Sequence, residues 1–166
     1  MSLKRIAVAA LSLSAAGFGG LVAHEWYTET AVIPTKNDRP TIGFGSTFRE
    51  DGTPVEMGDK IDPVKAVKRS IAHIAKDEAG LKNCVTGELH QKEYDILVDF
   101  AYQYGVQTAC KSSMVRHINS GNYVAACNSY PLYKYAGGYD CSIHTRICGG
   151  VHTRNLKRQS DCLGAQ

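Results

Sequence analysis

Hydrophobic residues recur at helical spacing in the central part of the chain. Asp62 followed by Pro63 is typical of a helix start, with the aspartate as N-cap and the proline in the first turn. The apolar residues that follow at intervals of three and four are Val64, Val67, Ile71 and Ile74. This spacing predicts an amphipathic helix with those four side chains on its buried face. Gly80 is a plausible residue to end it.

Similar patterns predict more helices further along the chain. One runs over about 90–104, buries several apolar side chains and ends at Gly105. Its predicted buried residues are Tyr94, Leu97, Val98 and Ala101. Two shorter helices are expected from Ser112 or Ser113 to about 118 and over 123–128, and a polar one over 153–162. Residues 134–150 are glycine-rich and predict a loop.

The segment before these helices has a different pattern. Residues 24–60 are rich in Thr, Gly and Pro, and Pro40–Thr47, PTIGFGST, has the turn and β character of a short hairpin. The body of the chain is therefore predicted to be α+β, with a small β-hairpin lobe followed by a larger helical lobe.

The N-terminus has the pattern of a membrane segment. Lys4 and Arg5 precede an uncharged run, Ile6–Ala23, which predicts an N-terminal hydrophobic helix with the body on the outer side of the membrane. Alanine, glycine and serine dominate this run, so its hold on a bilayer is expected to be weak. A cleaved signal peptide and a buried core helix are the alternatives. The predicted division is a membrane segment over 1–24 and a folded body over 25–166.

Composition and charge narrow the class of protein. The 166 residues are 43% hydrophobic and 21% charged, which excludes a disordered, collagen-like or coiled-coil chain. The formal net charge of +3 is too small to indicate nucleic acid as a partner.

All six cysteines lie in the second half of the chain, which fits disulfides formed in an oxidising compartment. Cys141–Cys148 is the pairing with the easiest local geometry, while the other pairings stay open. Reduced core thiols and a zinc site are the alternatives. No cysteine pair has zinc-finger spacing and the six histidines show no metal spacing, so no metal or other cofactor is expected.

Few side chains have the position expected of a catalytic group. Glu25 follows the apolar run, and a carboxyl group between apolar surface and a cleft keeps its proton and can act as a general acid. From its position alone, a surface glutamate that marks the end of the membrane segment is the default interpretation. Thr41 opens the hairpin sequence, where its hydroxyl can hold a water or simply fill a β position. Glu29 and Asp38 flank the hairpin and are possible second carboxylates, although exposed turn charges are the default interpretation of both.

Taken together, these segments resemble the phage-type lysozymes of glycoside hydrolase family 24, and more narrowly the signal-anchor-release endolysins. The resemblance covers nearly the whole chain. It is carried by "HE" with "PTIGFGST", then by "EYDILVDFAYQYG", "KSSMVRHINSGNY" and "GGVHTRNLKRQSDC", in that order. It implies a lysozyme-like fold and a catalytic set of Glu, then Asp or Cys, then Thr.

Glu25 and Thr41 match the first and last members of that set, but the middle member has no acidic match. The family's spacing leads to Pro34 when counted from Glu25 and to Thr35 when counted from Thr41, because the intervening segment has one extra residue. Thr35 is the preferred substitute, holding the water by its hydroxyl, and Asp38 is its competitor.

The resemblance implies hydrolysis, with inversion, of the β-1,4 bond between N-acetylmuramic acid and N-acetylglucosamine in peptidoglycan. The expected protein is a monomer, held in the host inner membrane through residues 6–23 and then released to the periplasm. The resemblance also implies that collapse of the membrane potential triggers this release. A catalytically weakened murein-binding protein and a lytic transglycosylase are the rival functions.

Overall fold

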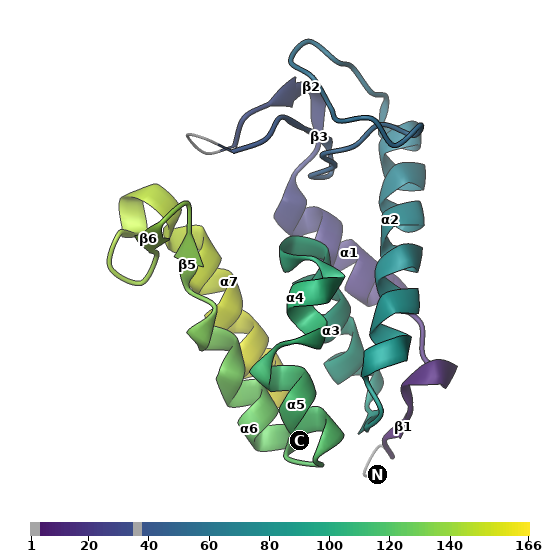
Figure 1. Ribbon diagram of the computed structural model, residues 1–166, viewed down its shortest axis with the longest axis vertical. Coiled ribbons are helices and arrows are strands. Elements are labelled where there is room, and N and C mark those ends of the chain that lie inside the picture. Colours follow the sequence, from purple (N-terminus) through teal and green to yellow (C-terminus); the bar gives the residue numbers. More distant parts are fainter. Residues whose placement is uncertain (1–3, 35–37) are drawn as a thin grey trace. The chain divides into compact units, whose positions relative to one another are not determined.

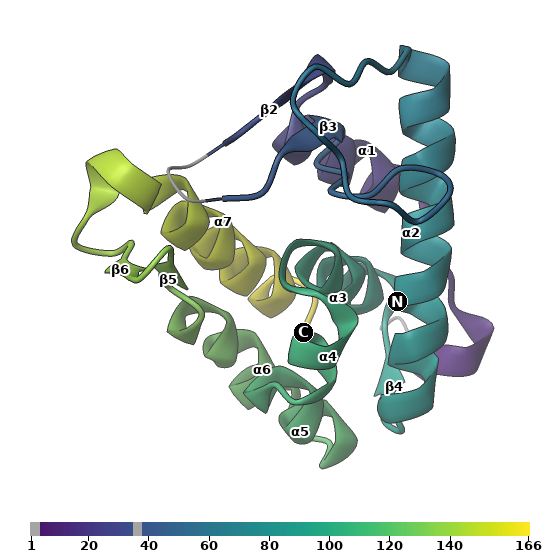
Figure 2. The ribbon, with the colours of Figure 1, turned by 45° about the horizontal axis from the view of Figure 1, so that its top comes forward.

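The computed structural model describes residues 4–34 and 38–166. The chain divides into two compact units, one formed by residues 18–76 and the other by residues up to 17 together with 77–166 (Figures 1 and 2). Two helices, α1 (Ala15–Glu25) and α2 (Pro63–Cys84), contribute residues to both units.

The unit of residues 18–76 is built on an antiparallel pair of strands, β2 (Thr28–Val32) and β3 (Thr41–Gly43). The predicted hairpin at 40–47 is confirmed, since the backbones of Ile42 and Ser46 exchange two hydrogen bonds of 2.9 and 3.0 Å. A small apolar core lies beneath it. Its buried members are Ala31, Ile42, Val55, Ile61 and Ala66.

Helix α2 begins as predicted, at Pro63, and the side chain of Asp62 accepts a 2.9 Å hydrogen bond from the backbone N–H of Lys65. Its predicted buried face is only partly correct, because Val64 and Ile71 are 64% and 53% exposed. The residues that are buried instead, together with Ile74, are Ala66, Ser70, Asp77 and Leu81. The hairpin packs closely on the helix at Ala66, where a Cβ on Gly43 would lie 3.0 Å from the Cβ of Ala66.

The predicted end of this helix at Gly80 is wrong. The helix continues to Cys84, and Gly80 allows a close approach inside the second unit. A Cβ at position 80 would meet Cγ2 of Val106 at 2.5 Å. This glycine is therefore required by packing and does not stop the helix.

The second unit is mainly helical (Figure 1). Its elements are β1 (Ile6–Ala7), β4 (Glu88–Leu89), α3 (Gln91–Tyr104), α4 (Val106–Cys110), α5 (Ser113–Asn119), α6 (Tyr123–Ser129), β5 (Tyr135–Ala136), β6 (Tyr139–Asp140) and α7 (Thr145–Leu163), together with 3₁₀ turns at Val8–Ala10 and Tyr130–Leu132. The helices predicted over 90–104, 112–118 and 123–128 are confirmed, and Gly105 ends α3 with a φ of 84°. The side-chain oxygen of Ser112 caps α5 by accepting a hydrogen bond from Val115.

Residues 134–150 differ from the predicted loop. They contain the hairpin of β5 and β6 and the first residues of α7, which begins eight residues before the predicted 153. Cys148 interrupts α7 with a φ of −144°, so the helix is kinked there. Its disulfide with Cys141 ties the kink to the end of the hairpin.

Disulfides are present, as predicted from the even number of cysteines. Besides Cys141–Cys148, the pairs are Cys84–Cys110 and Cys127–Cys162. The two cysteines are 7 residues apart in Cys141–Cys148, 26 apart in Cys84–Cys110 and 35 apart in Cys127–Cys162. Cross-links of this kind restrict the unfolded chain and typically stabilise a fold by about 2–4 kcal/mol each.

The uncharged run Ile6–Ala23 does not form the continuous hydrophobic helix that its composition predicts. It contains β1, which pairs with β4, then the 3₁₀ turn Val8–Ala10 and most of α1. Among residues 4–34 and 38–166, no helix has the length and apolar character needed to span a bilayer. In this structure the N-terminal segment is part of the folded protein, with Val8 and Leu11 buried.

Charged and polar contacts fix this segment within its unit. The Arg5 guanidinium donates hydrogen bonds of 2.8–3.3 Å to the carboxylate of Glu93 and lies 3.6 Å from the ring centre of Tyr123. Burial disfavours the charge on Glu93, but the hydrogen bonds from Arg5 and others outweigh it and lower the pKa of Glu93. Ser14 caps α1 by accepting from Gly17 and donates to Asp95 at 2.5 Å.

Candidate active site

Glu25 and the glycine-rich turn, which the sequence identifies separately, lie together in the unit of residues 18–76. Glu25 is the last residue of α1 and is half-buried. Its Oε2 lies 2.7 Å from the position that a Cβ on Gly45 would occupy. Gly45 also has a φ of 77°, so both its backbone conformation and the close approach of the carboxylate require glycine.

Aromatic and backbone contacts support the turn that holds Gly45. The Tyr27 hydroxyl donates a 2.6 Å hydrogen bond to the carbonyl of Ile61, and the ring of Tyr27 lies 5.7 Å from that of Phe44. Phe44 of the turn thus packs on a ring that is itself hydrogen-bonded to Ile61 of the small apolar core.

Thr41 is the first residue of β3 and pairs with Val32 of β2. Its side chain is half-buried, and its hydroxyl donates a long 3.4 Å hydrogen bond to the carbonyl of Val32. The oxygen of Thr41 thus keeps its acceptor capacity for a water molecule.

Of the two candidates for the middle position of the catalytic set, the structure describes only Asp38. Thr35 lies outside the described residues. Asp38 is exposed, and its Oδ1 accepts a 2.8 Å hydrogen bond from the backbone N–H of Arg39. Pro34 and Glu29 are exposed as well. The hydrogen bond of the Asp38 side chain is thus made to the neighbouring residue in the chain.

His73 on α2 is electrostatically coupled to Glu25 and was missed by the sequence reasoning. Burial and the charge of Lys76 lower the pKa of His73, while the negative charge of Glu25 opposes them. The charged form of the imidazole is therefore less favourable than in an ordinary histidine. A single histidine without metal spacing carries no signal in the sequence, so only the fold could place it near Glu25.

Trp26 is the other residue that the sequence reasoning missed. It follows Glu25, is 79% exposed and has a φ of 50°. A left-handed conformation costs a side chain other than glycine roughly 1–2 kcal/mol. The sequence could have singled it out by its position, because it is the sole tryptophan and directly follows the candidate acid.

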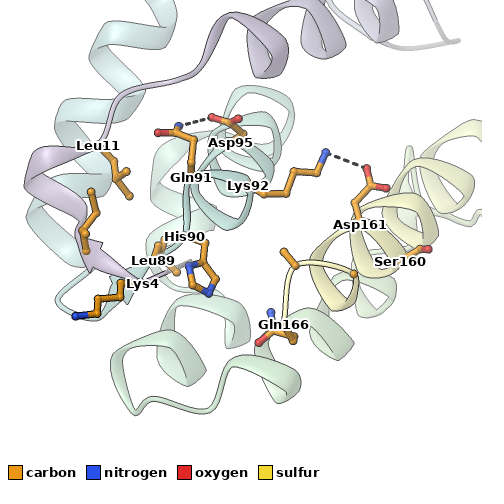
Figure 3. Close-up of a pocket in the computed structure, with 13 residues that line it drawn as sticks. Lys4, Leu11, Leu89, His90, Gln91, Lys92, Asp95, Ser160, Asp161 and Gln166 are labelled. Atoms are coloured by element: carbon orange, nitrogen blue, oxygen red, sulfur yellow. Dashed lines mark hydrogen bonds and ion pairs between the residues drawn. The ribbon is translucent and has the colours of Figure 1, made fainter. Parts of the chain in front are cut away.

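A pocket of about 900 Å³ lies in the other unit, beside the N-terminal segment, and contains none of the candidate catalytic residues (Figure 3). Two carboxylates line it, but both have structural partners. Asp95 accepts hydrogen bonds from Gln91 and Ser14, and Asp161 pairs with Lys92 at 3.6 Å (Figure 3). These contacts leave neither carboxylate as an obvious acid or base.

No group of three or more metal-ligating side chains is found within residues 4–34 and 38–166. The candidate groups in the unit of residues 18–76 are the carboxyl group of Glu25, the hydroxyl of Thr41 and the backbone of the tight turn at Gly45.

Comparison with known proteins identifies the family. Residues 20–155 match the family model named phage lysozyme, which covers most of the chain and includes both Glu25 and the turn. The chain belongs to the phage lysozyme family. This lysozyme is a glycoside hydrolase of the muramidase type, and the family acts on peptidoglycan.

Individual relatives agree with this membership. The lysozyme is 32% identical over 98 residues to the endolysin of Salmonella phage P22, a match covering 59% of this chain and 67% of that one. It is also 32% identical over 130 residues to the SAR-endolysin of Escherichia phage 933W, covering 75% and 71% of the two chains.

Solved structures confirm the lysozyme-like fold with mixed helices and small sheets. An endolysin from Escherichia coli O157:H7 phage FAHEc1 superposes with a TM-score of 0.78 at 25% identity, covering 93% of this lysozyme and 94% of that chain. A P22 lysozyme mutant superposes with a TM-score of 0.72 at 24% identity, covering 92% and 99%. The predicted α+β fold class is confirmed, apart from the N-terminal hydrophobic helix.

Proposed function

We propose that this enzyme hydrolyses the β-1,4 bond between N-acetylmuramic acid and N-acetylglucosamine with Glu25 as the general acid. The supporting observation is the position of Glu25 directly against Gly45 of the TIGFG turn. Glu25 donates its proton to the glycosidic oxygen as the bond breaks through an oxocarbenium-like state. A general acid of this kind contributes roughly 10²–10⁴ in rate.

Water is proposed to attack from the opposite face of the sugar. Thr41 offers its hydroxyl oxygen as acceptor, and Thr35 or Asp38 supplies the second contact. Position 34 is a proline and not an acidic residue. Activation of the water is therefore expected to be less effective than in a site with two carboxylates. Attack from the face opposite to the leaving group inverts the anomeric centre, so the new hemiacetal first forms as the α anomer.

Analysis of the digestion products tests this reaction against its rival. Purified enzyme acting on murein is expected to release fragments with a reducing N-acetylmuramic acid end, first as the α anomer by NMR. A 1,6-anhydro end would instead identify a lytic transglycosylase, which also needs a single acid. The same digestion with Thr35→Ala and Asp38→Ala assigns the water-holding group, because the variant lacking it clears murein more slowly.

We further propose that residues 6–23 hold the newly made protein in the inner membrane and that the catalytic body, 25–166, lies in the periplasm before and after release. The polar ends and weak apolar character of the run support a reversible anchor. The packed conformation of the same residues supports release, since Val8 and Leu11 exchange one apolar environment for another. Peptidoglycan is then reached by the released monomer.

The glycines of α1 provide a test that separates anchoring from folding. A side chain at Gly19 or Gly20 would meet no atom within 4 Å, so leucines there fit the released fold. Two leucines favour membrane insertion by about 1 kcal/mol in total, or roughly fivefold in the equilibrium. The double variant Gly19→Leu with Gly20→Leu is therefore expected to delay lysis and to increase the membrane fraction on cell fractionation.

The matched control replaces the same two glycines by glutamine, which is similar in size but polar. It is expected to leave the membrane fraction no larger than in the wild type. Gly17→Leu is unsuitable, because a Cβ there would lie 2.7–2.8 Å from Leu13 and Asp95 and would disturb the fold. Unchanged lysis timing in the leucine double variant would contradict the anchor proposal.

A further inference from the structure

Trp26 combines three features that are unusual together. Its side chain is 79% exposed, and within the described part of the chain it makes no hydrogen bond, ion pair or ring contact. Its φ of 50° makes it the single residue other than glycine with a positive φ among those described. It also follows Glu25 directly, at the point where α1 ends.

Two of these features reduce the stability of the folded protein. An exposed indole ring does not contribute the favourable free energy that burial of its large apolar surface would give. A positive φ is strained for any residue with a Cβ. Observed backbone outliers of this kind cluster at active sites and ligand clamps, where the surrounding structure fixes them. The folded protein thus keeps a large aromatic side chain exposed to solvent, on the residue that follows the candidate acid. No hydrogen bond, ion pair or ring contact within the described residues explains why it is held there.

We infer that Trp26 is a stacking platform for one sugar ring of the glycan, an inference that rests on the proposed role of Glu25. Consecutive Cα atoms lie about 3.8 Å apart, so the backbone that carries the indole adjoins that of Glu25. The C–H faces of a pyranose are apolar and fit an aromatic face, while the free indole N–H can donate to a hydroxyl or N-acetyl oxygen.

A membrane surface is the other partner that attracts exposed tryptophan, and Trp26 closely follows the run Ile6–Ala23. The glycan is favoured because the strained backbone is a property of the folded unit, where Glu25 packs on Gly45. An interfacial tryptophan next to an inserted helix gains nothing from that fixed conformation. The two partners are separated by the experiment below.

Because the chain has one tryptophan, its tryptophan fluorescence reports on Trp26 alone. In the Glu25→Gln protein, which keeps the glycan intact, titration with peptide-free murein glycan strands is expected to shift the tryptophan emission saturably and to protect it from acrylamide. Vesicles of phosphatidylethanolamine and phosphatidylglycerol provide the second arm. A response to the vesicles with none to the glycan would overturn the inference in favour of a membrane contact.

Calorimetric titration with the same strands gives the affinity of variants that lack the reporter. In the Glu25→Gln background, Trp26→Gly is expected to weaken glycan binding about three- to tenfold, the range of one aromatic stacking contact, and Trp26→Phe to weaken it less. The thermal midpoint of Trp26→Gly should not fall, because glycine accepts the positive φ without strain. Met57→Ala, which trims another exposed apolar side chain of the same unit, is the matched control and should bind normally.

Equal affinity in Trp26→Gly and its parent would refute the stacking role even if Glu25 is the acid. Conversely, full clearing activity in Glu25→Gln would refute the proposed acid while the fluorescence response still reported whether glycan lies on the indole. The two failures are therefore distinguishable.

Discussion

Glu25→Gln is expected to lose the ability to clear outer-membrane-permeabilised cells, with a rate at least 10²-fold and up to about 10⁴-fold below that of the wild type. Glutamine has nearly the same shape as glutamate, so it can pack against Gly45, but it has no proton to transfer at the glycosidic oxygen. Turbidity decrease measures the rate, and the thermal unfolding midpoint verifies that the fold is retained.

The matched control for this substitution is Glu50→Gln, which removes one negative charge from an exposed position of the same unit. It is expected to clear cells at nearly the wild-type rate. If both variants were equally impaired, loss of charge in the unit would explain the effect. If neither were impaired, Glu25 would not be the acid.

The second large effect is expected at Asp99, which pairs with two arginines of α7. Its Oδ1 lies 2.6 Å from Nη2 of Arg154, and its Oδ2 accepts a 2.7 Å hydrogen bond from Nε of Arg158. The Arg158 side chain is only 4% exposed, so Asp99→Ala leaves a buried cation without its carboxylate. A loss of about 3–5 kcal/mol in the free energy of unfolding is expected, measured by denaturant titration.

Asp161→Ala is the control, because its pairs with Lys157 and Lys92 lie at the surface and are each worth at most about 1 kcal/mol. If Asp99→Ala fails to fold, Asp99→Asn provides the measurement. A loss for Asp99→Ala no larger than for Asp161→Ala would show that the buried pair does not stabilise the fold.

The same pair gives a pH dependence. Burial raises the pKa of Asp99, but the charges of Arg158 and Arg154 outweigh it, so the pKa in the folded state lies below the ordinary value. The stabilisation is therefore complete above the pKa of the unfolded chain and is lost as the pH falls through the folded value. Unfolding measured from neutral to acid pH should show this loss in the wild type and a smaller one in Asp99→Asn.

Periodicity and capping were sufficient to predict most helices, because Ser112, Gly105 and Pro63 act locally. The buried face of α2 could not be predicted in the same way. Val64 and Ile71 are the more hydrophobic residues, yet Ala66 and Ser70 are buried, and at Ala66 the closely packed hairpin accepts only a small side chain. Steric fit with a distant segment decided that face, and no pattern within the helix reports it.

The candidate site was predicted as separate pieces. The family resemblance indicated Glu25 and Thr41, and the structure places the Glu25 carboxylate against Gly45, a contact for which no local sequence pattern exists. The coupling of His73 and the exposure of Trp26 depend on how the chain folds around them, so neither had a sequence signal strong enough to select it. The middle position, with Thr35 outside the described residues, stays a prediction.

The contact between Arg5 and Glu93 has a consequence for the energetics of leaving the bilayer. On the proposed topology Arg5 and Lys4 begin on the cytoplasmic side, whereas Glu93 belongs to the periplasmic body. Pulling both cations outward against an inside-negative voltage costs about 2.3 kcal/mol per charge for each 100 mV, close to 5 kcal/mol for the two. If the protein starts in that topology, a polarised cell opposes formation of the ion pair electrically and a discharged cell removes that opposition. On this proposal, pairing of Arg5 with the buried carboxylate of Glu93 depends on the membrane voltage.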